Sequence, residues 1–211
     1  SIYRANTLLE EVANLEGATP ESVKRISAEA KFVRALCHYH LVRIWAMPYG
    51  YTADNSHLGV PLKLSADQTP QMRATVAEVY VAIEQDLLDA ESDLPTSNGI
   101  FANQMSAKAL LAKVYLEMGD FTKAKTKASG VINSGSYSLE QDLTKRFNDH
   151  VNDNLPDEFI FTLVSTNEMG ASGPVVDERG QGFVGNYRSD DPNSNPALKA
   201  SLDLYVAATS D

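Results

Sequence analysis

Apolar residues in the first 135 positions recur every three or four residues, the spacing that gathers them on one face of an α-helix. The first such pattern begins at Ile2 and runs to Gly17, a residue type that suits a helix C-cap. Its apolar positions are Ile2, Ala5, Leu9, Val12 and Leu15. The pattern therefore predicts a short amphipathic helix at the start of the chain.

A longer helical pattern follows, and it carries a start signal. Thr19 supplies a capping hydroxyl, Pro20 suits the first helical position, and Glu21 places an acid near the positive end of the helix dipole. The apolar stripe continues to about Ala46, and the sequence Met-Pro-Tyr-Gly ends it. Its members are Val23, Ile26, Ala30, Val33, Cys37, Leu41 and Ile44, widened by Phe32, Leu36, Tyr39 and Trp45. Because the stripe is wide, we expect this helix to be buried on two sides, with Trp45 in the core.

A third helix is bounded by a capping signal and a proline. Residues 51–73 predict a connecting loop rich in Gly and Pro. Thr75 and Glu78 then have the spacing of a capping box. In this motif the Thr75 hydroxyl accepts a hydrogen bond from the Glu78 amide, and the Glu78 carboxylate accepts one from the Thr75 amide. The apolar positions Val79, Ile83, Leu87, Ala90 and Leu94 follow, and the helix is expected to end before Pro95.

The next stretch has the pattern of a tetratricopeptide helix pair. Ser106 is a candidate N-cap, Gly119 ends the first helix, and Asp120 begins a partner helix that Gly135 closes. Within 109–121 small residues stand where two antiparallel helices would approach closely, and a Gly-Asp turn joins them. The two earlier long helices would form a second, looser pair with an insertion between them.

The last third of the chain changes character. Residues 159–164 predict one short buried strand, whereas 170–196 are rich in Gly, Pro, Asn and Asp and predict loops. We therefore expect a single domain over 1–211, with a helical scaffold in 1–135 and a loop-rich part in 136–211. The patterns at both ends are cut short, so the chain is expected to be a piece of a longer protein.

Composition and charge narrow the classes of function. The net charge of −10 in 211 residues, with no basic cluster, argues against nucleic acid and against an anionic membrane surface. Cys37 is the only cysteine, so no internal disulfide or cysteine cluster can form. No apolar run reaches the roughly 18 residues of a membrane span, so no transmembrane segment is expected.

Several separated motifs recur in a recognisable order along the chain. They lie at 29–36 (EAKFVRAL), 40–43 (HLVR), 59–62 (GVPL), 75–87, 107–116 (AKALLAKVYL), 131–139 (VINSGSYSL), Phe147 and 157–161 (DEFIF). From about Tyr3 to about Val164 their order and spacing resemble those of the SusD/RagB-type family of outer-membrane nutrient-binding lipoproteins. Beyond Gly170 no motif aligns.

The resemblance implies a mostly α-helical protein with tetratricopeptide-like helix pairs, a SusD-like α-superhelix with an irregular, loop-rich C-terminal third and one or two short strands. It also implies a lipoprotein on the cell surface of Bacteroidetes that caps a SusC-like TonB-dependent transporter and captures glycans, or in some members peptides, without catalysis. Family members are longer and carry an N-terminal lipidated cysteine. We expect that this chain does not contain that anchor, because its one cysteine, Cys37, lies inside a predicted helix.

The sequence offers little catalytic, cofactor or metal chemistry. Residues 180–185 (GQGFVG) match a dinucleotide-binding string, but the Asn/Asp/Pro/Ser-rich segment after them cannot open the helix that this site requires. His38 and His40 are two residues apart and lie on different helix faces, so they cannot share a zinc ion. The acidic loop 148–158 could hold calcium but lacks EF-hand spacing, which favours a solvated loop. We expect no cofactor, no metal and no enzymatic activity.

Two segments have the composition of a sugar site, in which aromatic faces stack on pyranose rings and polar side chains bind hydroxyls. The first contains Tyr49, Tyr51 and Asn55 and follows the long helix. The second contains Asn186, Tyr187 and Arg188 in the loop-rich part. These six residues are the predicted ligand-binding residues.

The sequence thus predicts non-catalytic binding of an oligosaccharide at the cell surface, for import through the TonB-dependent partner. Three alternatives stay open: capture of a peptide, a helical-repeat adaptor that binds only protein, and a glycoside hydrolase. An adaptor should have a peptide-sized groove and no exposed aromatic cluster. A hydrolase would need two carboxylates facing each other at roughly 5–10 Å, which no sequence pattern indicates.

Overall fold

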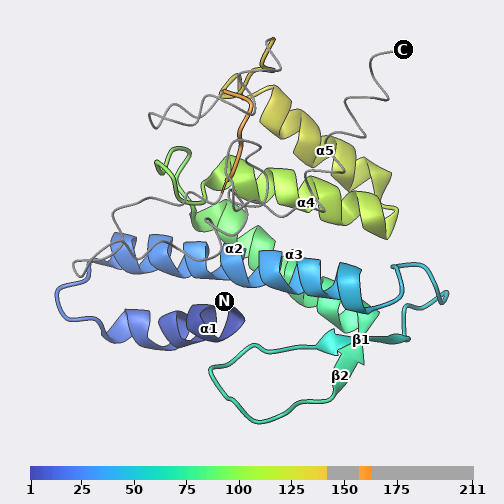
Figure 1. Ribbon diagram of the computed structural model, residues 1–211. Helices are drawn as coiled ribbons and strands as arrows, with labels where there is room; N and C mark the ends of the chain where they lie inside the picture. The colour runs from blue at the N-terminus through green and yellow to red at the C-terminus, as the bar shows by residue number, and fades with distance from the viewer. Residues whose placement is uncertain (142–156, 163–211) are drawn as a thin grey trace, which may run out of the picture. The chain divides into compact units, whose positions relative to one another are not determined.

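The structure is a computed structural model that describes residues 1–141 and 157–162. Most of the described chain is helical, as predicted (Figure 1). The helices are α1 (Ile2–Glu11), the 3₁₀ turn η1 (Val12–Asn14), α2 (Pro20–Trp45), α3 (Val76–Asp93), α4 (Gln104–Met118) and α5 (Phe121–Ile132). Two short strands, β1 (Leu58–Pro61) and β2 (Arg73–Thr75), complete the described elements.

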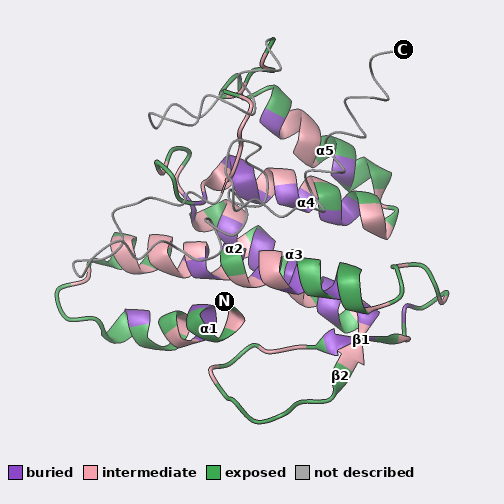
Figure 2. Cartoon of the chain, in the orientation of Figure 1, coloured by how far each residue is buried: buried purple, intermediate pink, exposed green. Residues whose placement is uncertain are grey.

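The helices pack in consecutive pairs. α2 lies against α3 and α4 against α5, α3 joins the two pairs, and α1 covers another side of α2 (Figure 1). The predicted tetratricopeptide-like pairing is therefore confirmed. The buried side chains line the facing surfaces of these helices, and the outward faces are exposed (Figure 2).

The long helix α2 begins as predicted but buries a different face. Thr19 caps it by accepting a hydrogen bond from the Ser22 amide. The buried side chains are Ala28, Ala30, Phe32, Ala35, His38, Tyr39 and Val42. The predicted stripe is therefore wrong in part, since Val33, Leu41 and Ile44 are exposed. The alanines explain the choice, because small side chains let α3 approach this face closely.

Trp45 is the clearest correction to the predicted core. It lies at the last position of α2 with 69% of its surface exposed. The helix ends there, so no following turn covers the ring.

The later helix boundaries follow the predicted signals with one change. Thr75 and Glu78 form the predicted capping box, and Val79, Ile83, Leu87, Ala90 and Leu94 are all buried. Asn103, rather than Ser106, caps α4, because Ser106 is the third residue of the helix and its hydroxyl accepts a hydrogen bond from the Asn103 amide. Gly119 then ends α4 in the left-handed conformation, at φ 77°.

The strands lie where the sequence predicted only a loop. Within 51–75, β1 and β2 pair antiparallel, with Leu58 opposite Thr75. Gly59 permits the close approach, because a Cβ there would stand 3.0 Å from the Ala74 carbonyl oxygen.

The strand predicted over 159–164 is wrong in its described part. Residues 159–162 form no strand. Instead the Phe161 ring packs edge-on against Phe32 of α2, with ring centroids 4.9 Å apart. Its apolar surface is thus buried by a helix rather than by a sheet.

A buried ion pair ties the first three helices to the loop after β1. Arg34 of α2 donates two hydrogen bonds to Asp86 of α3, both at 2.7 Å. Its remaining terminal nitrogen donates to the side chain of Asn6 in α1 and to the Leu64 carbonyl. Asn6 in turn donates to two loop carbonyls. This network fixes the position of the loop against the helices.

Candidate functional site

A cavity of about 330 Å³ opens where α2 ends, next to the start of α3 and the end of α4. α2 stops there because Pro48 cannot continue it, and Gly50 turns the chain at φ 86°. The lining residues are Val42, Arg43, Ala46, Met47, Pro48, Tyr49, Tyr80 and Glu117. We refer to it as the Tyr49 cavity.

Glu117 of α4 organises the polar side of the Tyr49 cavity. One of its oxygens accepts from the Tyr39 hydroxyl at 2.8 Å and lies 2.8 Å from Arg43 Nε. The other oxygen accepts from the Tyr80 hydroxyl at 3.0 Å. Three helices, α2, α3 and α4, therefore converge on one carboxylate.

Both tyrosines of this cluster are held in the protonated form. Burial raises the pKa of Tyr39, and its hydrogen bond to Glu117 raises it further. Burial and the negative charge of Glu117 likewise raise the pKa of Tyr80. Each hydroxyl therefore keeps its proton and donates a hydrogen bond to Glu117.

The three predicted residues after α2 have different environments. Tyr49 lines the cavity, and its half-buried ring packs edge-on against Tyr80 with centroids 4.9 Å apart. Tyr51 is exposed and lies edge-on to His57, outside the lining. Asn55 is only 7% exposed, and its side-chain oxygen accepts from the Gly50 amide at 2.5 Å, so it shapes the turn.

The second predicted cluster lies outside the described residues. This applies to Asn186, Tyr187 and Arg188, to the string at 180–185, and to most of the acidic loop 148–158. Within the described ranges, no group of three or more His, Cys, Asp or Glu side chains could hold a metal ion.

Two of the described histidines, His38 and His57, have structural contacts. His38 is buried in α2 and accepts a hydrogen bond from the Lys63 amide at 3.3 Å. Burial lowers its pKa, which keeps the ring neutral. His57 is within hydrogen-bond distance of the Thr52 hydroxyl and of the Met47 carbonyl, so it holds the turn beside the Tyr49 cavity.

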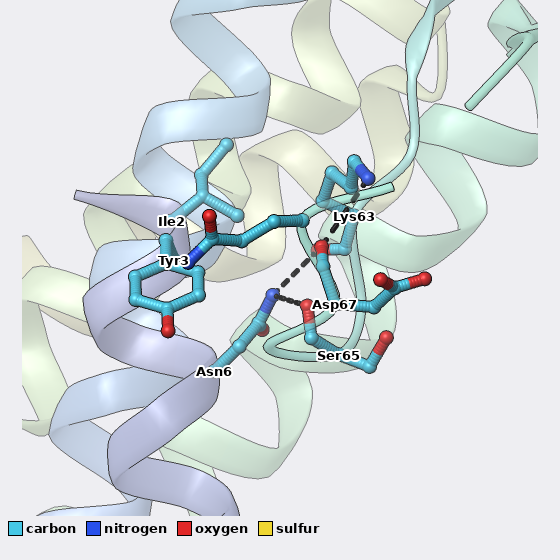
Figure 3. A pocket seen from close by; sticks show the side chains of 7 residues that line it. Ile2, Tyr3, Asn6, Lys63, Ser65 and Asp67 are labelled. Carbon is cyan, nitrogen blue, oxygen red and sulfur yellow. Dashed lines mark hydrogen bonds between the residues drawn. The ribbon is translucent and has the colours of Figure 1, made fainter. Parts of the chain in front are cut away.

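A second hollow, of about 460 Å³, lies between α1 and the loop after β1 (Figure 3). Its polar groups are already engaged in holding that loop. Asn6 donates to the Lys63 and Ser65 carbonyls, and the Lys63 ammonium donates to the Asp67 and Thr69 carbonyls. The Tyr49 cavity therefore has the stronger claim as a ligand site.

Comparison with known proteins identifies the family. A family model described as "Starch-binding associating with outer membrane" matches residues 1–116. The SusD-like protein P2 of Formosa agariphila is 32% identical over 169 residues, which is 76% of this chain. The chain belongs to the SusD-like family. The resemblance seen in the sequence is thus confirmed.

Solved SusD-like structures share the helical arrangement. A SusD superfamily protein of Bacteroides thetaiotaomicron is 32% identical with a TM-score of 0.67, over 78% of this chain and 37% of its own. A laminarin-binding SusD-like protein is 29% identical with a TM-score of 0.56, over 70% of this chain and 33% of its own.

The present chain spans about a third of the length of these relatives, and 31% of the length of protein P2. The family description associates its members with the outer membrane. Among the described helices, none combines the length and the hydrophobicity that a bilayer span requires.

Sequence reasoning did not identify the polar half of the Tyr49 cavity. Arg43, Tyr80 and Glu117 lie 37 residues or more apart, so no local spacing links them. The available signal was indirect: Tyr39 belongs to an apolar stripe, Tyr80 directly follows Val79 of another, and Glu117 follows a buried helical face.

Proposed function

We propose that the protein captures an oligosaccharide at the cell surface without cleaving it, for import through a SusC-like TonB-dependent transporter. The family description and the laminarin-binding relative support a glycan as the ligand. The lipid anchor and the transporter belong to the same proposal, as properties of the full-length family member.

The observation that carries the proposal is the two-sided lining of the Tyr49 cavity. Val42, Ala46, Met47 and the Tyr49 ring form an apolar wall, and Glu117 and other polar groups face the same space. Sugars present apolar ring faces and directional hydroxyls, so such a lining suits them. The cavity volume of about 330 Å³ is at the small end of ligand sites, which suits one sugar unit of a longer chain.

A binding role is favoured over hydrolysis by the carboxylates of the cavity. Glycoside hydrolysis uses two carboxylates, roughly 5–10 Å apart. Within the described part of the chain, Glu117 is the one carboxylate that lines this cavity. It is already bonded to two tyrosines and an arginine, which leaves it poorly placed as a general acid.

Binding by tyrosine variants tests the site. Tyr49→Ala should weaken glycan binding, measured by isothermal titration calorimetry with maltoheptaose and laminarihexaose. Tyr51→Ala tests whether an exposed ring beside the cavity adds a contact, and its melting temperature should not change. The same titration on Tyr187→Ala tests the second predicted cluster, which also contains Asn186 and Arg188. Unchanged affinity in all three variants would show that the ligand binds elsewhere.

An exposed apolar patch supports the proposed contact with the transporter. Leu41, Ile44 and Trp45 are exposed together at the end of α2. Exposed apolar clusters of this kind often mark protein interfaces. Ile44→Glu combined with Trp45→Glu should reduce co-purification of the co-expressed transporter while leaving glycan affinity unchanged. Loss of glycan affinity with an intact complex would contradict this division of surfaces.

A further inference from the structure

Glu117 has hydrogen-bonding capacity left in the Tyr49 cavity. A carboxylate offers about four acceptor sites. The hydroxyls of Tyr39 and Tyr80 take two of them, and Arg43 Nε forms an ion pair with one of the oxygens at 2.8 Å. The tyrosine protons are committed to Glu117, so the remaining acceptor capacity of the carboxylate is the place where a ligand hydroxyl could donate.

Arg43 supplies donors beside that acceptor. Its guanidinium lies over the Tyr39 ring, 5.1 Å from the centroid, and its Nε faces Glu117. An arginine has five N–H groups, and among the described residues only the one on Nε has a protein partner. The side chain is 49% exposed, so its terminal nitrogens can reach a ligand in the cavity.

We propose that the Tyr49 cavity binds an uncharged pyranose unit through two neighbouring hydroxyls. One hydroxyl donates to Glu117, the other accepts from Arg43, and the apolar face of the ring lies against Tyr49. Tyr39 and Tyr80 are positioning residues that hold the carboxylate in place. This inference rests on the proposed function and names the class of sugar that the site takes.

The charges of the site favour a neutral sugar. Arg43 and Glu117 neutralise each other, so the cavity has no unpaired positive charge for a uronate or a sulfate ester. The chain as a whole has a net charge of −10, which repels anionic glycans. An anionic sugar would also bring its charge close to the partly buried Glu117 carboxylate.

A matched pair of variants tests the inference. Glu117→Gln removes the charged acceptor of the cavity. The control, Glu84→Gln, removes a similar carboxylate away from it. Glu84 accepts from the Tyr115 hydroxyl at 2.8 Å and lies 3.3 Å from Lys123, which itself lies over the Tyr115 ring. Both variants should lose similar stability, so a difference in affinity reports the site rather than the fold.

Calorimetric titration with maltoheptaose, laminarihexaose and a hexamer of galacturonate gives the readout, with thermal melts as the check on folding. We expect the wild type to bind a neutral probe in preference to the galacturonate. Glu117→Gln should bind it about tenfold more weakly, the value of about one good hydrogen bond. Arg43→Gln leaves both tyrosine contacts of Glu117 in place and should weaken binding similarly, which covers the case in which Glu117→Gln fails to fold.

The failures of the two proposals are distinguishable. If the wild type binds a neutral probe but Glu117→Gln and Arg43→Gln bind it equally well, the cavity inference is wrong and the capture function stands. Preference for galacturonate also overturns the inference. If the wild type binds none of the three probes, the proposed function is contradicted, and the inference falls with it.

Discussion

Replacing Arg34 with methionine should destabilise the protein strongly, because Arg34 pairs with Asp86 in the interior. The side chains of the two residues are 11% and 7% exposed. Arg34→Met keeps much of the side-chain volume but leaves both Asp86 oxygens without their guanidinium. Removing one partner of a buried pair costs about 3–5 kcal/mol. The Leu64 carbonyl and the Asn6 side chain also lose a donor.

Urea unfolding followed by circular dichroism measures this loss. The control is Lys24→Met, which breaks an exposed ion pair with Asp93. The side chains of Lys24 and Asp93 are 58% and 31% exposed. Surface pairs contribute at most about 1 kcal/mol, so the control should change little. The double variant Arg34→Met/Asp86→Leu should lose less than Arg34→Met alone, because no unpaired charge remains. Equal losses in Arg34→Met and Lys24→Met would refute the assignment of Arg34 as the junction of α1, α2 and α3.

Three further predictions concern single positions. Gly119→Ala should lower the free energy of unfolding by about 1–2 kcal/mol in urea, because φ is 77° there, and an unchanged midpoint would contradict the left-handed cap. Burial lowers the pKa of His38 below its usual 6.5, so the unfolded state binds more protons and stability should fall as the pH drops through and below 6.5. In urea titrations at several pH values, His38→Gln should lose less stability than the wild type as the pH drops. An equal pH dependence in the two proteins would show that other groups cause the loss. The fluorescence of Trp45, the only tryptophan, should be readily quenched by acrylamide, and weak quenching would contradict the exposure of its ring. Trp45→Ala should change the free energy of unfolding by less than about 0.5 kcal/mol.

The features that the sequence predicted well depend on neighbouring residues. Thr75 and Glu78 are three positions apart, and their capping box forms through contacts within one turn. Gly119 and Asp120 likewise mark a helix end and a helix start by their own backbone and side-chain chemistry. Such local signals survive whatever the rest of the chain does.

The face of α2 could not be predicted in this way. Its sequence carries two apolar stripes, one through Val33, Leu41 and Ile44 and one through Phe32 and Tyr39. Periodicity alone does not distinguish them. The choice depends on how closely α3 can approach, which is a property of two helices separated by a long loop.

The candidate site was predicted only in part for the same reason. Tyr49, which lines the candidate cavity, was predicted because aromatic and hydrogen-bonding side chains occur together in its loop. Glu117 and Tyr80 contribute through contacts across three helices, and nothing in their sequence surroundings distinguishes them from ordinary helix residues. The pairing of β1 with β2 was missed because the two strands are joined by a long connection rather than by a tight turn.

The most direct test of the central claim is a calorimetric titration of the protein with maltoheptaose and laminarihexaose, followed by chromatography of the sugar after prolonged incubation. We predict saturable binding of at least one of them, with the oligosaccharide recovered intact. No binding of either glycan, or recovery of shortened products, would contradict capture without catalysis.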